Sequence, residues 1–116
     1  MGAKLEKQTF KFPSTKEGSK NVSLRVEICS SWGFYAYLDD AKSFAEHLTT
    51  KGFNVSLEAV PKAGGNGEYF LYQILNEGSK KIIFSNDNRH KENGAVVNYD
   101  MDPQIYNEII RNIKAE

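Results

Sequence analysis

Two stretches of alternating hydrophobicity, one on each side of a helical segment, constrain the fold of this chain more than any other feature. In residues 22–28 every second side chain is apolar, which predicts a strand with one buried face. From Phe34 to Leu48 the apolar spacing becomes that of an amphipathic helix, and alternation returns in residues 53–59. A strand, a crossover helix and a second strand imply a parallel, right-handed pair. The chain is therefore predicted to be α/β.

The rest of the chain predicts two more strands and a second helix. Residues 68–75 and 80–84 are apolar on both faces and flank a tight turn, which indicates a β-hairpin. Asp102 and Pro103 suit the start of a helix whose apolar stripe reaches Ile113. We expect a two-layer sandwich in the order β-α-β-β-β-α. Its four-stranded mixed sheet has the order 2-1-3-4, and both helices cover one face.

Residues 1–21 are interpreted as an extension that precedes this domain of residues 22–116. Residues 8–12 alternate polar and apolar side chains, which predicts a short edge strand that ends before Pro13. With both helices on one face of the sheet, apolar side chains of the hairpin remain on the other, open face. We expect either Phe10 and Phe12 of the extension or a partner protein to cover them.

Charge and cysteine content narrow the classes of function. The 116 residues include 15 basic and 15 acidic side chains, so nothing favours binding to nucleic acid or an anionic membrane. No apolar run approaches the roughly 20 residues that cross a bilayer, and no secretory signal is recognisable, which predicts a cytoplasmic protein or one of an organelle matrix. The single cysteine, Cys29, excludes a disulfide scaffold. His47 and His90 have no metal-ligand spacing to it, so no metal is expected.

Cys29 lies where the first strand gives way to the helix, a place where the helix dipole favours a thiolate. Residues 29–34, Cys-Ser-Ser-Trp-Gly-Phe, resemble the Cys-x-x-(selenocysteine or Cys)-Gly-Tyr motif of the selenoprotein W, T and H (Rdx) family of small thioredoxin-like proteins. The resemblance covers residues 22–114, including Val60-Pro61 with the glycine-rich stretch after it, and residues 81–85. It implies a thioredoxin-like fold in which Pro61 corresponds to the cis-proline beside the redox loop. Since most X–Pro bonds are trans, the sequence leaves the isomer open.

Trp32 departs from the family pattern, because it occupies the position of selenocysteine or its cysteine replacement. An indole offers no nucleophile for a thiol–disulfide cycle. We therefore predict a redox-impaired relative, without a cofactor, that acts as a binding or structural subunit of a larger assembly. Its protein partners are expected at the open sheet face and at the loop with its flanking residues, namely Ser30, Ser31, Trp32, Gly33, Phe34 and Pro61.

Three alternatives stay open. Cys29 would be the catalytic residue of a one-cysteine oxidoreductase that forms a mixed disulfide with glutathione, or else it is an inert, partly buried thiol. Trp32 is either an interface anchor or part of a local core. A small-ligand pocket beside the glycine-rich connector, residues 61–67, is the third alternative.

Overall fold

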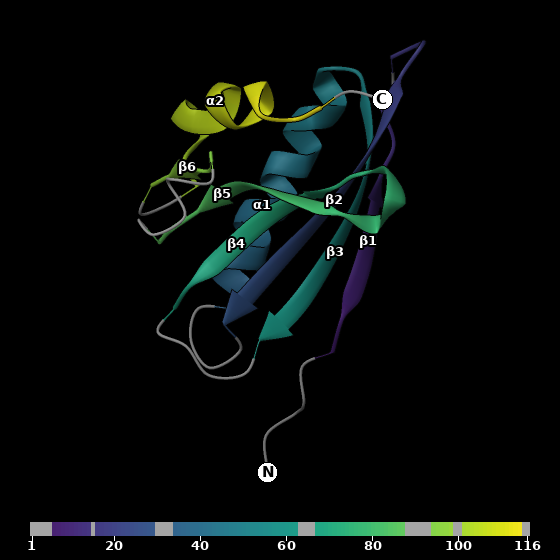
Figure 1. The fold of residues 1–116 in the computed structure, drawn as a ribbon. Helices are drawn as coiled ribbons and strands as arrows, with labels where there is room; N and C mark the ends of the chain where they lie inside the picture. Colours follow the sequence, from purple (N-terminus) through teal and green to yellow (C-terminus); the bar gives the residue numbers. More distant parts are fainter. Residues whose placement is uncertain are drawn as a thin grey trace.

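One mixed β-sheet with two α-helices on one side makes up the fold (Figure 1). The computed structural model describes residues 6–14, 16–29, 34–62, 67–87, 94–98 and 101–114. The elements in chain order are β1 (Gln8–Phe12), β2 (Lys20–Cys29), α1 (Phe34–Thr50), β3 (Phe53–Lys62), β4 (Tyr69–Ile74), the 3-10 turn η1 (Asn76–Gly78), β5 (Lys80–Ser85), β6 (Val96–Val97), the 3-10 turn η3 (Pro103–Ile105) and α2 (Tyr106–Arg111).

The described sheet has six strands in the order β1-β3-β2-β4-β5-β6. Its four central strands, β3-β2-β4-β5, follow the predicted order, and β2 pairs parallel with β3 as the crossover helix required. The β4–β5 hairpin is antiparallel. The predicted number of four strands is wrong, because β1 extends one side and β6 the other. β6 is only two residues long, too short to produce a recognisable alternation.

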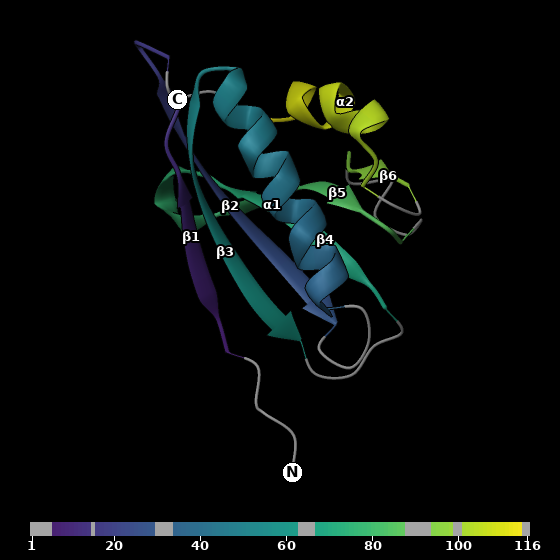
Figure 2. The same cartoon turned by 180° about the vertical axis from the view of Figure 1, so that it is seen from behind.

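The main core lies between the sheet and its helices. β2 contributes alternate apolar side chains and α1 contributes its apolar stripe, as their periodicities predict. The α2 residue Tyr106 places its ring 5.1 Å from that of Phe44 on α1, so both helices cover the same face (Figure 2). Asp102 caps the turn before α2 by accepting a hydrogen bond from the Gln104 amide at 2.8 Å.

A buried glutamine attaches the end of the chain to the sheet. Gln73 on β4 is 2% exposed. Its side-chain amide donates to the carbonyl of Lys114 at 2.6 Å, and its carbonyl accepts from the amide of the same residue at 2.8 Å. Lys81 on β5 adds a bond to the Asn112 carbonyl at 2.7 Å. These polar side chains interrupt apolar strands because they satisfy backbone groups beyond α2.

The extension adds an edge strand to the sheet, and its two phenylalanines point to the face that the helices cover. Residues 8–12 form the predicted edge strand, with Phe10 opposite Leu57 and Phe12 opposite Val55. Both phenylalanines therefore pack against the main core, and the Lys42 ammonium lies 4.6 Å from the Phe10 ring centre. The suggestion that these rings cover the open face of the hairpin is wrong, since the register of β1 directs them to the opposite face.

Candidate functional site

The predicted centre of function, Cys29, is the last residue of β2. The residue is 2% exposed, and its amide donates to the Glu68 carbonyl at 3.1 Å. Lys62 is its register partner on β3. The loop residues Ser30, Ser31, Trp32 and Gly33 lie outside the described residues. The structure therefore places the first position of the motif, and its burial limits access to the sulfur.

The end of the motif brings one aromatic side chain into the core and another into solvent. Phe34 begins α1 and is 6% exposed. Tyr35 is 66% exposed and meets the Phe34 ring edge-on, with centroids 5.4 Å apart. Tyr35 was not among the predicted site residues, although its position outside the apolar stripe of the helix could have identified it.

Pro61 lies beside the strand that carries Cys29, opposite Ile28 in the parallel β2–β3 ladder. Every peptide bond between described residues is trans, that of Pro61 included. The cis-proline that the resemblance suggested is therefore absent at this position. β1 pairs with β3 only as far as Ala59, so no described strand lies beside Pro61 on that side, and the missing N–H is tolerated there.

A carboxylate shared by two lysines occupies the open face of the sheet. The Glu27 side chain is 10% exposed, and its oxygens lie 3.5 Å from Lys62 Nζ and 3.1 Å from Lys80 Nζ. The same ammonium groups lie 5.5 Å from the Phe70 ring centre and 4.3 Å from that of Tyr72. Burial, and then the charge of Glu27, raises the pKa of Tyr72.

The apolar side chains of the β4–β5 hairpin on the open face are mostly buried. Phe70 and Ile82 on the open face are only 7% and 8% exposed and form a second small cluster with Ala95. Among the described residues, Tyr35 is the large apolar side chain that is exposed to solvent. The expected apolar patch is thus already covered, in part by lysine side chains whose ammonium groups lie over the rings.

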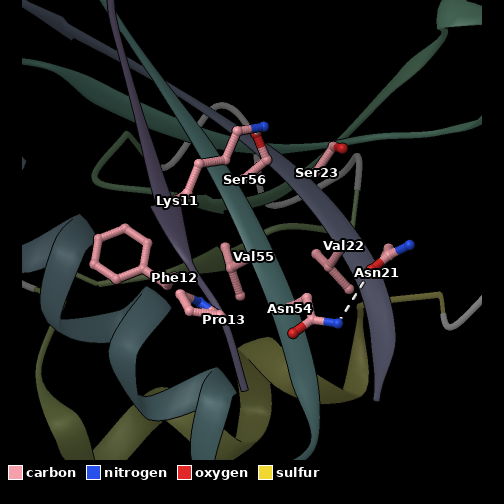
Figure 3. A pocket seen from close by; sticks show the side chains of 9 residues that line it. All are labelled: Lys11, Phe12, Pro13, Asn21, Val22, Ser23, Asn54, Val55 and Ser56. Atoms are coloured by element: carbon pink, nitrogen blue, oxygen red, sulfur yellow. Dashed lines mark hydrogen bonds between the residues drawn. The ribbon is translucent and has the colours of Figure 1, made fainter. Parts of the chain in front are cut away.

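A shallow pocket of about 460 Å³ lies at the other end of β2, away from Cys29 (Figure 3). Two amides meet there: Asn54 Nδ2 donates to Asn21 Oδ1 at 3.3 Å, while Asn54 Oδ1 accepts from the Ser14 amide at 2.8 Å. Its lining residues are Lys11, Phe12, Pro13, Asn21, Val22, Ser23, Asn54, Val55 and Ser56. The pocket suggested beside the glycine-rich connector falls largely on residues 63–66, outside the described residues.

The described residues contain neither a metal-ligand group nor a membrane-spanning helix. Within the described ranges, no three His, Cys, Asp or Glu side chains are grouped so that they could hold a metal ion. None of the helices described is both long and apolar enough to cross a membrane.

Comparison of the chain with protein-family models, with curated proteins and with solved structures gave no match. The resemblance to selenoprotein W therefore stays a prediction that depends on the motif and its context.

Proposed function

We propose that this chain is a redox-impaired, thioredoxin-like relative of selenoprotein W and serves as a binding or structural subunit of a larger protein assembly. The observation that carries the proposal is the state of its one thiol. Cys29 is buried at the end of β2, and Trp32 occupies the position of the second redox residue.

The chemistry of thiol–disulfide exchange explains why this observation matters. A thiolate attacks a substrate disulfide and forms a mixed disulfide, and a second thiolate must then attack the enzyme sulfur to release the product and leave an internal disulfide. This chain has no second cysteine to carry out that step. An external thiol would have to reach a residue with only 2% of its surface exposed. Both facts count against turnover.

The arrangement of the central strands supports the thioredoxin-like part of the proposal. The order β3-β2-β4-β5, with a parallel β2–β3 pair and both helices on one face, is the arrangement that the resemblance implies. Pro61 also lies next to the strand that ends in Cys29. Its trans bond and the added strand β1 are departures from the family pattern.

The exposed aromatic ring next to the motif supports the binding part. Tyr35 projects from the first turn of α1, three residues after Trp32 in the sequence. Tyrosine and tryptophan supply large, rigid contact areas and are enriched among residues that dominate protein interfaces. An exposed aromatic residue at the start of α1 suits an anchor for a partner protein.

Restoring the missing thiol tests the redox part. Wild-type protein is expected to reduce a disulfide substrate no faster than the Cys29→Ser variant, with dithiothreitol or glutathione as reductant. Trp32→Cys recreates a Cys-x-x-Cys pair and is expected to form an internal disulfide, detected by mass and thiol titration. Turnover by the wild type that disappears in Cys29→Ser would overturn the proposal.

The binding part is tested in extracts of the native source. The chain is expected to elute from size-exclusion chromatography well above its 13.1 kDa mass. Tyr35→Ala and Trp32→Ala are expected to shift it towards the monomer, whereas Asn107→Ala, at an exposed position on α2, serves as the matched control. Elution of the wild type as a monomer would contradict an assembly role.

One observation favours the second candidate, a one-cysteine oxidoreductase that uses glutathione. Lys62 stands opposite Cys29 in the β2–β3 register, and a nearby ammonium group stabilises a thiolate. This candidate requires faster alkylation of Cys29 by iodoacetamide in the folded chain than in the urea-unfolded chain at pH 7. We expect the reverse, because the folded residue is buried.

A further inference from the structure

β1 leaves one side of the sheet open to another strand. It stands first in the strand order, and among the described strands it pairs with β3 alone. Along an edge strand, alternate backbone N–H and C=O groups point away from the sheet, where they can pair with an extended segment. The outer side of residues 8–12 therefore offers backbone hydrogen bonds that β3 does not use.

The two faces of this edge differ in chemistry. On the open face, Lys7 has a 61% exposed side chain, and Thr9 and Lys11 are exposed. On the helix face, Phe10 and Phe12 are only partly buried. A strand added here would alternate in the same way, with one set of side chains beside the lysines and the other beside the phenylalanine rings.

The charge around the lysines selects the partner. Lys7 and Arg25 both contact the Glu58 carboxylate, at 3.6 Å and 2.7 Å. Lys11 donates to Ser56 Oγ at 2.9 Å and shares that exposed surface. Lys7 and Lys11 thus add two positive groups to the open face of this edge, while Glu58 is already paired with Arg25 of β2 as well as with Lys7. Carboxylates on an incoming strand would find partners there, and ammonium groups would be repelled.

A second copy of this chain fits the edge poorly. If two β1 strands pair antiparallel about Thr9, Lys7 of each copy faces Lys11 of the other, and like charges directly opposite are destabilising. If they pair about Phe10, Lys11 of each copy faces Thr9 of the other and stands diagonal to its Lys7 and Lys11, so like charges again lie close together. Both registers keep the apolar faces matched, so the charge of the occupant decides.

We propose that β1 accepts an extended segment of a partner protein as a seventh strand, with carboxylates at alternate positions opposite Lys7 and Lys11 and apolar side chains beside Phe10 and Phe12. Backbone hydrogen bonds supply the pairing and the alternation supplies the specificity. This inference rests on the proposed binding role and adds to it the edge of the sheet formed by β1.

The test uses synthetic peptides and the full chain. A fluorescein-labelled eight-residue peptide of alternating Glu and Val is titrated with protein, and its anisotropy is compared with that of a Lys–Val peptide of equal length. We expect saturable binding of the acidic peptide only. Lys7→Glu combined with Lys11→Glu is expected to weaken it about tenfold or more, because each attraction becomes a repulsion. The single variant Lys11→Glu is compared with Arg111→Glu on α2, a control that changes the net charge equally outside the proposed surface.

Peptides methylated at alternate backbone nitrogens, in both phases, test strand addition itself. At least one phase is expected to abolish binding, because its methyl groups replace the donors to β1. Equal binding of both phases, equal binding of the Lys–Val peptide, or no binding at millimolar protein would overturn the inference. None of these outcomes depends on Cys29, so a finding of thiol turnover would refute the proposed function and leave the peptide result standing.

Discussion

Replacing Lys62 and Lys80 together by methionine should destabilise this fold more than replacing those lysines and Glu27 at once. Methionine keeps an unbranched apolar side chain of similar length but removes both ammonium groups, which lie over the aromatic rings. The Glu27 carboxylate, 10% exposed, then has lost both ion pairs. If Glu27→Gln is added, the buried charge itself is gone, and the amide costs less to keep away from water.

The size of each stability change follows from the exposure of the three side chains. The lysine side chains are 51% and 44% exposed, so each ion pair contributes only about 0.2–1 kcal/mol. Stranding a buried carboxylate costs about 3–5 kcal/mol, and the remaining exposure of Glu27 places this site near about 3 kcal/mol. The triple variant should lose only about 1 kcal/mol. At about 4 °C per kcal/mol for a chain of this length, the double variant melts roughly 12 °C below the wild type.

Urea unfolding at pH 7, followed by far-ultraviolet circular dichroism, measures both variants. Lys16→Met with Lys51→Met, two exposed positions outside this network, is the control and should stay close to the wild type. A double variant within about 1 kcal/mol of the wild type, which is the range of two exposed ion pairs, would contradict this expectation. So would a triple variant that is no more stable than the double.

Three further outcomes are expected. Gln73→Ala should lower the free energy of unfolding by about 2 kcal/mol and speed hydrogen exchange at the Lys114 amide, because both hydrogen bonds to that residue are lost. Tyr69→Phe should cost about 1–2 kcal/mol in urea titrations, since its hydroxyl accepts from the buried Met101 amide at 2.9 Å. Burial raises the pKa of Tyr72, so the unfolded chain loses this proton before the folded chain does. The free energy of unfolding therefore falls as pH rises above about 10. Thermal melts at a series of pH values should show a smaller fall for Tyr72→Phe.

The order of the four central strands could be predicted because the sequence patterns that determine it are local. The alternation in residues 22–28 and 53–59, with a helix between them, required a parallel pair, and the tight turn before β5 required a hairpin. The face of each residue in β5 was harder to predict. A register shift between Leu71 and Tyr72 places Ile82 in one cluster and both Ile83 and Phe84 in the other. Hydropathy alone shows only that all are apolar.

The surroundings of the candidate site could not be predicted, because they depend on contacts between distant residues. Lys62 and Lys80 come from different strands, and only the folded sheet places them over Glu27 and the aromatic rings. The sequence consequently suggested an open apolar patch where the structure has a covered one. Cys29 at the end of β2 was predicted from the point at which alternation stops, and its near-complete burial was not.

The position of β1 also bears on how the protein tolerates shortening. β3 is a ten-residue strand whose outer side is occupied by β1. A truncated chain that begins after Pro13 would leave β3 unpaired along Val55 and Leu57. The edge of the sheet would then be a long apolar strand in place of the short β1, which carries Lys11. Such fragments should be prone to aggregation even if their core still forms. Residues 8–12 would therefore protect the edge of β3 from pairing with other chains.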